Sequence, residues 1–355
     1  MRVEGPVLVV GAGLLGTSIG LALRRAGVDV GLEDVDPEHL RTAMGLGAAN
    51  VRVGADAAAL VVVAVPPDHL AGEIGRALQA GAGTVTDVGS VKAAPLAAVG
   101  AQVSADELTR YVGGHPMAGS ERSGPLAASA SLFDGRPWAV SPHATSTAAA
   151  TAAVYALAEG CGAAPVAFTP DEHDLAVART SHLPHLVAAL VAGRLAEAPA
   201  EHLALSGQGV RDVTRIAAGD PAMWRQIVTA NGAALTELLT AVRGDVDALL
   251  GALASGDEDA LTALLDRGVA GTSAIPAKHG GPARDDAVLY VAVPDHPGEL
   301  ARLFAEAGEI GVNVEDVRID HDPGREVGLV ELTVDAAAVT HLEQSLGARG
   351  WTTHR

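Results

Sequence analysis

Residues 7–16 read VLVVGAGLLG, an apolar run followed by glycines at positions 11, 13 and 16. A short apolar run bounded by glycine is typical of a parallel strand that is covered on both faces. The glycine spacing fits a strand–turn–helix unit in which a pyrophosphate lies on the helix N-terminus. We therefore predict that this turn binds a dinucleotide, although a glycine turn without a ligand is the alternative. The predicted contacts are Gly11, Gly13, Leu14, Leu15 and Gly16.

Two carboxylates end the next predicted strand, Val28–Leu32. A carboxylate at about this distance from the glycine turn bonds the adenosine ribose 2′-hydroxyl. Asp34 is the better candidate because it stands at the strand tip, and Glu33 is the second choice. A carboxylate there repels a 2′-phosphate and no arginine is beside it, so we predict NAD rather than NADP as the cofactor.

The pattern continues as helices and strands in alternation. A helix is expected over Leu14–Ala26 with Gly27 just past its end, followed by strands at Ala59–Val65 and Thr84–Asp87. Alternation of this kind implies right-handed crossovers and a doubly wound parallel sheet. We predict a Rossmann-type α/β domain over residues 1–168.

Two more loops are expected at the carboxyl edge of this sheet, where a cofactor crosses it. One holds Val65, Pro66 and Pro67, whose prolines predict a stiff loop, and these residues are candidate cofactor contacts. The other follows the fourth strand, and there Ser90 and Lys92 are expected to present polar groups to the cleft. Either loop alone could be structural.

The pattern of apolar residues changes after residue 168. Residues 171–274 show no strand pattern and many leucines at helical spacing, which predicts an all-helical domain over 169–275. One apolar seam indicates either intrachain core or a dimer contact, and we favour a homodimer. The seam comprises Leu235, Leu238, Val242, Val246, Leu249 and Leu253.

A linker rich in glycine and proline, residues 276–285, precedes a third unit at 286–355. Its predicted order is β-α-β-β-α-β, a ferredoxin-like arrangement. The expected elements are a strand at Val288–Val293, a helix at Glu299–Glu309, a strand at Val312–Asp320, a turn at residues 322–324, a strand at Glu326–Val334, a helix at Ala336–Arg349 and a short strand at Trp351.

Composition excludes several classes of partner. The net charge of −19 disfavours nucleic acid and anionic membrane surfaces, and no basic run offsets it. The longest apolar run, Ala57–Val65, is too short to span a bilayer. The chain enters its first strand too early for a signal peptide, and its single cysteine, Cys161, suits a reducing compartment. We expect a cytoplasmic protein, and no metal site is predicted.

Three histidine- or arginine-bearing motifs are candidates for the chemistry. The first is Gly113–Glu121, in which proline holds the backbone of His115 extended and glycines leave its ring uncrowded. The second is SHLPH at residues 181–185, and the third runs from Asp212 to Arg225. Asp220 and Pro221 in the third motif predict the start of a helix. An isolated histidine is more often structural than catalytic.

Taken in order, GAGLLG, VPP, DVGSVK, GHPMAGSE, SHLPH and TRIAAGDPAMW resemble the prephenate dehydrogenases, the tyrosine-pathway TyrA family, over about residues 5–275. The resemblance implies NAD-dependent oxidation and decarboxylation of prephenate to 4-hydroxyphenylpyruvate. It implies that His115 accepts the hydroxyl proton and that Ser90 bonds either that histidine or the hydroxyl. It also implies that Arg215 binds a substrate carboxylate, that Ser181 and Asp174 support the pocket, and that His185, Arg211 and Trp224 line it.

The third unit has a resemblance of its own. Residues 293–300 and 311–314 are similar to those of ACT domains, modules that often bind amino acids in regulated enzymes. This implies a tyrosine or related effector near Asp295, Gly298, Leu300 and Asn313. A purely structural or dimerising module is the alternative.

Other functions are left open by the sequence. Arogenate dehydrogenase performs the same chemistry on an amino-acid analogue of prephenate, and a different NAD-linked dehydrogenase is a more distant choice. A non-catalytic amino-acid sensor is the candidate from another class. The intact glycine turn and the presence of Ser90, His115 and Arg215 argue against that sensor.

Overall fold

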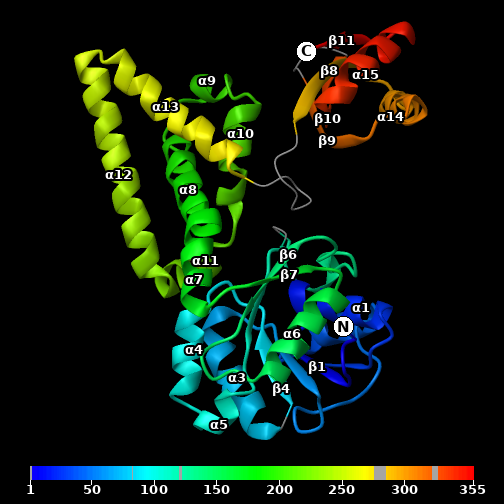
Figure 1. Ribbon diagram of the computed structural model, residues 1–355, viewed down its shortest axis with the longest axis vertical. Helices are drawn as coiled ribbons and strands as arrows, with labels where there is room; N and C mark the ends of the chain where they lie inside the picture. The colour runs from blue at the N-terminus through cyan, green and yellow to red at the C-terminus, as the bar shows by residue number, and fades with distance from the viewer. Residues whose placement is uncertain (1, 82, 120–121, 276–284, 322–326) are drawn as a thin grey trace. The chain divides into compact units, whose positions relative to one another are not determined.

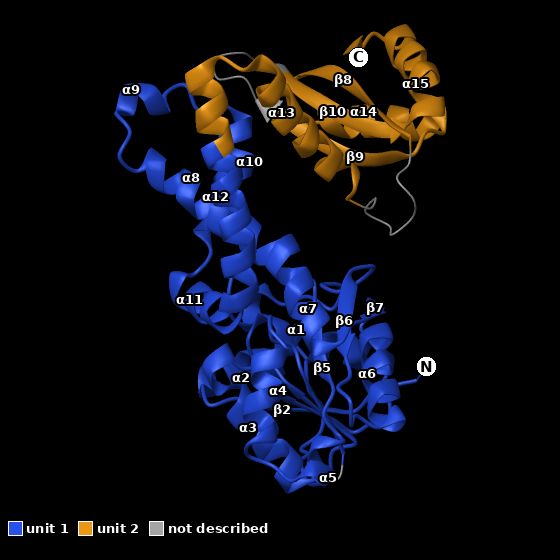
Figure 2. Ribbon diagram, turned by 60° about the vertical axis from the view of Figure 1, so that its left-hand side comes forward, with its two compact units in different colours: residues 1–247 blue, residues 248–355 orange. Residues whose placement is uncertain are grey.

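The computed structural model describes residues 2–81, 83–119, 122–275, 285–321 and 327–355. The chain forms two compact units, residues 1–247 and 248–355, and their boundary lies within the long helix α12 (Gly232–Ser255) (Figure 2). The predicted turn at 322–324 and nearly all of the predicted linker, residues 276–284, lie outside the described residues.

The first unit is built on a parallel sheet with the strand order β2-β1-β3-β4, of which β1 and β4 are labelled in Figure 1. The prediction of a doubly wound sheet is confirmed, because the chain leaves β1 on one side to form β2 and returns on the other to form β3 and β4. Two strands differ from their predicted bounds: β2 starts two residues later and ends one residue later, and β3 is shorter by one residue at its start and two at its end. The strands are β1 (Val7–Val10), β2 (Val30–Glu33), β3 (Leu60–Val63) and β4 (Thr84–Asp87).

Separate apolar cores cover the two faces of this sheet. On one face, α1 (Leu14–Arg25) and α6 (Ala148–Gly160) pack on Val7 and Val9, and on the other α3 (Pro67–Ala80) packs on Leu8. Because β1 is buried on both faces, its residues are all apolar, as the sequence pattern predicts. The sheet therefore offers its carboxyl edge to a ligand. The remaining helices of this domain are α2 (Pro37–Gly45), α4 (Ala93–Gly100) and α5 (Ala105–Leu108).

A second, three-stranded sheet was not predicted. Its strands β5 (Gly113–Pro116) and β6 (Pro137–Ser141) are antiparallel, whereas β6 and β7 (Ala164–Ala167) are parallel. A bridge between Val85 and Tyr111 joins this region to β4. The extended backbone expected at His115 is thus part of a strand, β5.

The region after β7 is helical, as predicted. No strand occurs in residues 169–275, all of which the structure describes. Asp220 begins α11 by accepting a hydrogen bond from the Ala222 N–H, and Pro221 is the first residue of the helix. The elements are α7 (Pro170–Val177), a π-helical turn (Ala178–His182), α8 (Leu183–Leu195), α9 (Ala200–Leu203), α10 (Gln208–Thr214), a 3₁₀ turn (Arg215–Ala218), α11 (Pro221–Ala230), α12, and in the second unit α13 (Glu258–Ser273).

One stretch of this region bears on the membrane prediction. Among the described residues, the continuous helix over Pro170–Leu195 is long and apolar enough to cross a membrane, judged by length and composition only. The same stretch carries the buried side chains of His173, Asp174 and His185. Buried ionisable groups of this kind are found in core helices of globular domains.

The C-terminal domain has the predicted β-α-β-β-α-β order, with an antiparallel sheet arranged β11-β8-β10-β9 (Figure 1). Its core consists of the inward side chains of the strands packed on the two helices, with Leu289, Val291 and Leu332 at its centre. The elements are β8 (Asp286–Pro294), α14 (Glu299–Ile310), β9 (Val314–His321), β10 (Val327–Asp335), α15 (Ala336–Ala348) and β11 (Thr352–His354).

Candidate active site

The glycine turn has the geometry that a dinucleotide requires. Gly11 has a φ of +106°, and a Cβ there would lie 2.4 Å from the carbonyl oxygen of Ala64. A Cβ at Gly16 would lie 1.8 Å from the Gly11 carbonyl oxygen, so the first and third positions accept only glycine. A Cβ at Gly13 would meet nothing within 4 Å, which leaves open space above the turn.

The N-terminus of α1 is equally suited to phosphate. Gly13 is its N-cap, no side chain caps the helix, and its first turn contains no acidic residue. The N–H groups of Leu14 and Leu15 therefore have no side-chain acceptor and stand where the helix dipole favours an anion. These residues fit the pyrophosphate of NAD.

Asp34 lies against this turn and holds a fixed orientation. One carboxylate oxygen accepts the Ala12 N–H, and the other accepts the Asp36 N–H at 2.7 Å. Glu33, the second choice, instead lies 3.4 Å from the guanidinium of Arg76. The preference for Asp34 over Glu33 thus agrees with the geometry at the end of β2.

The loop after β3 differs from the prediction. Pro66 is the N-cap of α3 and Pro67 its first residue, so the two prolines start a helix rather than form the predicted stiff loop. Proline is favoured at this position because its fixed φ suits the first helical turn and it has no N–H to leave unpaired.

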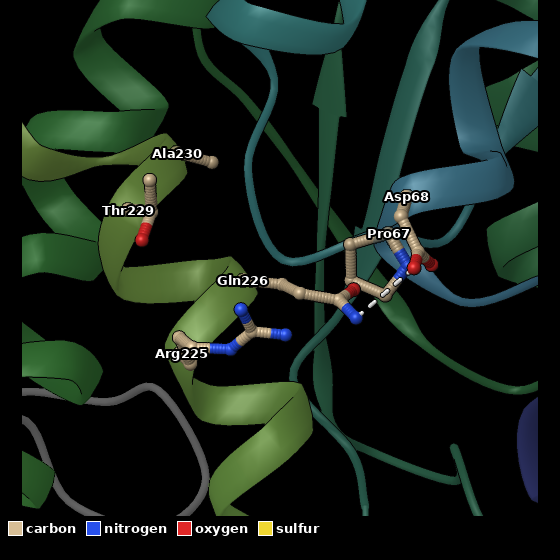
Figure 3. A pocket seen from close by; sticks show the side chains of 6 residues that line it. All are labelled: Pro67, Asp68, Arg225, Gln226, Thr229 and Ala230. Carbon is tan, nitrogen blue, oxygen red and sulfur yellow. Dashed lines mark hydrogen bonds between the residues drawn. The ribbon is translucent and has the colours of Figure 1, made fainter.

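An open groove of about 380 Å³ adjoins this helix start (Figure 3). Gln226 Nε2 donates to the Asp68 carboxylate at 3.2 Å, while its buried Oε1 has no partner within the described residues. The groove thus connects a predicted cofactor position, Pro67, with the helix that also carries Trp224. Its lining residues are Pro67, Asp68, Arg225, Gln226, Thr229 and Ala230.

Lys92 corrects one prediction. Its side chain does not face a cleft but is buried, with Nζ bonded to the Asp87 carboxylate and, at 2.7 Å, to the Gly114 carbonyl oxygen. Asp87 is also buried and accepts the Tyr111 hydroxyl at 2.9 Å. Because a buried charge is costly unless it is paired with an opposite charge, the buried carboxylate of Asp87 favours a buried position for the ammonium group of Lys92. Burial lowers the pKa of Lys92, and the adjacent Asp87 opposes that shift.

His115 is one of three ionisable side chains joined in a hydrogen-bonded line, His115–His173–Asp174, called the His115 line below. Its Nδ1 is 2.9 Å from Nε2 of His173, and Nδ1 of His173 is 2.8 Å from the Asp174 carboxylate. Burial lowers the pKa of His115 well below its ordinary value, and the charge on Lys92 lowers it further. The ring is therefore neutral at pH 7, as a general base must be.

Ser90 does not orient His115 directly. Among the described residues, the hydroxyl of Ser90 makes no hydrogen bond to His115, and the Nδ1 atom of that ring is engaged by His173. The other role given to Ser90, a hydrogen bond to the substrate hydroxyl, stays a prediction. Ser120 and Glu121, which complete the motif around His115, lie outside the described residues.

Asp174 anchors the His115 line to the backbone. Its two oxygens accept the backbone N–H groups of Lys92 at 2.8 Å and Ala93 at 2.9 Å, at the start of α4. Burial raises the pKa of Asp174, but hydrogen bonds from His173, Ala93 and Lys92 outweigh it, and the pKa is lower than usual. The carboxylate is therefore ionised. The sequence reasoning named Asp174 as a supporting residue but missed His173.

A second histidine of the helical region is also held in place. His182 is buried, and its Nδ1 lies 3.2 Å from Nδ2 of Asn231. Asn231 donates in addition to the backbone oxygen of Asp174 at 2.8 Å. Burial lowers the pKa of His182 to about 4, so this ring is neutral as well.

The predicted substrate residues are gathered in part. The rings of His185 and Trp224 stack with centroids 3.5 Å apart and an interplanar angle of 10°. The backbone of Ile216, which follows Arg215 in the 3₁₀ turn, lies near His185 and opposes the lowering of that histidine's pKa by burial. The turn that carries Arg215 thus lies beside α8, the helix of His185, whereas the side chains of Arg215, Arg211 and Ser181 are exposed.

Known proteins resemble the chain both in sequence and in structure. The family model for the nucleotide-binding domain of prephenate dehydrogenase matches residues 19–167, and that for its dimerization domain matches residues 169–267. A probable prephenate dehydrogenase of Streptomyces niveus is 36% identical over 97% of this chain and 98% of its own.

The chain belongs to the prephenate dehydrogenase family. Among solved structures, prephenate dehydrogenase from A. aeolicus in complex with hydroxyphenyl propionate and NAD+ matches with a TM-score of 0.67 and 27% identity, over 77% of this chain and 98% of that chain. Synechocystis arogenate dehydrogenase matches with a TM-score of 0.63 and 26% identity, over 75% of this chain and 98% of that chain.

Family membership and site geometry agree on the class of enzyme. As a member of the prephenate dehydrogenase family, the chain is an NAD-dependent oxidoreductase. Its glycine turn and Asp34 fit the cofactor. Within the described residues no group of three His, Cys, Asp or Glu side chains is arranged to hold a metal ion.

Proposed function

We propose that this chain is a prephenate dehydrogenase, which converts prephenate and NAD⁺ to 4-hydroxyphenylpyruvate, CO₂ and NADH in tyrosine biosynthesis. The observation that carries the proposal is the state of His115. Its ring is half-buried and neutral, and its Nδ1 is engaged by His173, so Nε2 is left to act on a substrate. Family membership supplies the substrate class.

The proton balance of the reaction suits a single neutral histidine. His115 Nε2 accepts the proton of the C4 hydroxyl as the C4–H hydride leaves, and bound NAD⁺ supplies the acceptor for that hydride. The ring carboxylate then leaves as CO₂, and its bonding electrons make the ring aromatic, with negative charge on the C4 oxygen. His115 returns the proton to that oxygen, so the side chain ends the cycle as it began.

Substrate recognition is proposed to rest on the helical region. Prephenate carries two carboxylates, and the guanidinium of Arg215 suits bidentate binding of one of them. The stacked rings of His185 and Trp224 lie beside the turn that carries Arg215 and offer an apolar wall to the ring of the substrate. Arg211 and Ser181 are assigned to the same pocket, and Ser90 to the substrate hydroxyl.

Initial rates test the substrate assignment. Prephenate and arogenate should each be assayed with NAD⁺ and with NADP⁺ at matched concentrations. Preference for prephenate with NAD⁺ supports the proposal, and preference for arogenate would transfer the same chemistry to the amino-acid substrate. That second candidate deserves the assay because an arogenate dehydrogenase is among the similar structures. Activity with neither substrate would contradict both assignments.

We propose a homodimer formed through the helical region. The family model for residues 169–267 is that of a dimerization domain. Within the predicted seam Leu235 is buried, but Val246 and Leu253 are exposed, which leaves apolar surface for a second subunit. Light scattering after size exclusion measures the mass directly, and a monomer at micromolar concentration would contradict the proposal.

We propose that the C-terminal domain is an ACT module that binds tyrosine or a related amino acid. Gly298 has a φ of +96° and begins α14 with no side-chain cap, so N–H groups near Asp295 and Leu300 can receive a carboxylate. Asn313 donates to Glu315 at 2.8 Å on the neighbouring segment. Calorimetry and kinetics with the twenty amino acids test this, and no binding with unchanged rates would contradict it.

We propose that the enzyme is cytoplasmic, because a single buried cysteine, Cys161, suits the reducing conditions there. Fractionation of cells that express the chain tests the placement, and recovery of the protein in the membrane or outside the cell would contradict it.

A further inference from the structure

We propose that His173 and Asp174 are positioning residues that fix the proton of His115 on Nδ1 and so keep Nε2 free as the base. This rests on the proposed function only for what Nε2 then does. The three side chains form a line, with 2.8 Å from Asp174 to His173 and 2.9 Å from His173 to His115.

The direction of the hydrogen bonds follows from Asp174. An ionised carboxylate only accepts hydrogen bonds, and Asp174 accepts them from the N–H groups of Lys92 and Ala93 as well as from His173. His173 must therefore carry its proton on Nδ1. A neutral imidazole has one N–H, so Nε2 of His173 is an acceptor. The only group facing it in the line is Nδ1 of His115, which must be the donor.

The same line stabilises the charge that forms during the reaction. When Nε2 of His115 takes a proton, the ring becomes an imidazolium in a half-buried site. Among the residues that the structure describes, the charged or titratable groups that act on it are Lys92, His173 and His182, none of which is an anion. Asp87 is already paired with Lys92. Asp174 is thus the carboxylate that offsets the new charge, acting through His173.

Asp174 also has a structural task, which the test must separate from the proposed one. Its contacts with Lys92 and Ala93 satisfy backbone donors at the start of α4, and Asn231 holds its backbone oxygen. Loss of these contacts alone would lower stability without changing the tautomer of a distant ring. A measurement of the tautomer itself therefore decides the question.

The first test is ¹⁵N NMR of the histidine side chains in the full chain without cofactor or substrate. The His115 signals are assigned by their loss in His115→Asn. We expect a protonated Nδ1 and an unprotonated Nε2 near pH 7.5 in the unmodified protein. A proton found on Nε2 of His115 would overturn the proposal. Because no turnover is needed, this result stands or falls separately from the choice of prephenate as substrate.

The second test is Asp174→Asn, which removes the negative charge that holds the His173 proton on Nδ1 but keeps an oxygen for the Lys92 N–H. We expect the share of His115 protonated on Nε2 to rise and kcat to fall at least ~10²-fold, by analogy with the tautomer error that an Asp-to-Asn change causes in other histidine-dependent enzymes. Asp171→Asn, on the exposed first turn of the same helix, is the matched control and should leave both unchanged.

A double-mutant cycle separates positioning from stability. In the His115→Asn background there is no ring to orient, so Asp174→Asn should lower kcat by less than about threefold more. If the two losses multiply instead, Asp174 acts independently of His115 and the proposal is wrong. Should Asp174→Asn fail to fold, the tautomer of the unmodified protein still decides.

Discussion

The glycine turn and the His115 line serve the same reaction but are built in different ways. The turn is made by Gly11, Gly13 and Gly16, with Asp34 arriving from the next strand. The His115 line joins β5 to α7, which are separated by more than fifty residues, and is anchored at the start of α4. Backbone conformation is local and depends on residue type, whereas the line depends on which buried polar groups the tertiary fold brings together.

The largest effect is expected in the turn. Gly16→Ala should abolish measurable NAD binding and lower the Tm, because the added Cβ would collide with the Gly11 carbonyl oxygen at 1.8 Å. Gly13→Ala is the matched variant, since its Cβ meets no protein atom within 4 Å. It should keep the Tm and weaken NAD binding only by obstructing the pyrophosphate. Fluorescence titration and thermal unfolding measure both, and equal behaviour of the two variants would contradict the assigned geometry.

His115→Asn tests the other region. We expect kcat to fall at least ~10²-fold, the usual contribution of a general base, while the Kd for NAD is unchanged. His202→Asn, at an exposed position in α9, is the control and should turn over normally. Normal turnover by the His115 variant would remove the base from the mechanism. A loss confined to NAD affinity would move His115 to the cofactor side of the site.

Arg215→Ala should raise the KM for prephenate about 10- to 100-fold, because a charge-assisted hydrogen bond to a carboxylate contributes roughly 1.5–3 kcal/mol. Arg215→Lys keeps the charge but not the bidentate geometry, so its effect should be intermediate. Arg194→Ala, at an exposed position on α8, is the control. An effect on the KM for NAD alone would show that Arg215 belongs to the cofactor site and not to the substrate pocket.

A smaller effect is expected at Gly219, which lies against the stacked rings. A Cβ there would be 2.5 Å from Nε1 of Trp224 and 3.2 Å from Cε1 of His185. Gly219→Ala should therefore displace the stack and raise the KM for prephenate several-fold, with NAD binding kept. Gly193→Ala, where a Cβ meets nothing within 4 Å on α8, is the control. Unchanged kinetics would separate the stack from the substrate site.

The weakest expected effect is on stability below neutral pH. Burial lowers the pKa of His115 and His173 and brings that of His182 to about 4, whereas an unfolded histidine titrates near 6.5. The unfolded chain then binds more protons, so stability is full above about pH 6.5 and falls as the pH drops toward 4. Urea midpoints at pH 7.5, 6 and 5 should decrease in that order, measured in high salt to screen the net charge. A midpoint that rises toward pH 5 would contradict the buried neutral rings.

The difference between local features and tertiary contacts also explains which parts of the structure could be predicted from the sequence. β1, the glycine turn and the C-terminal β-α-β-β-α-β order follow from local periodicity and turn residues, and they were predicted. β5 was missed because Gly113 and Gly114 give no alternating pattern. Lys92 was misplaced because its partner Asp87 is buried, which no local pattern reveals. His173 follows a helix-capping Thr169-Pro170 start, but only the contact with His115 makes it recognisable.

The most direct test is a crystal structure of the enzyme with NAD⁺ and 4-hydroxyphenylpropionate. We predict the ligand hydroxyl about 3 Å from Nε2 of His115, the distance of a proton-transfer contact, with the nicotinamide beside it and the guanidinium of Arg215 on the ligand carboxylate. A complex in which His115 and Arg215 contact different cavities, or in which His115 presents its protonated nitrogen to the hydroxyl, would contradict the mechanism.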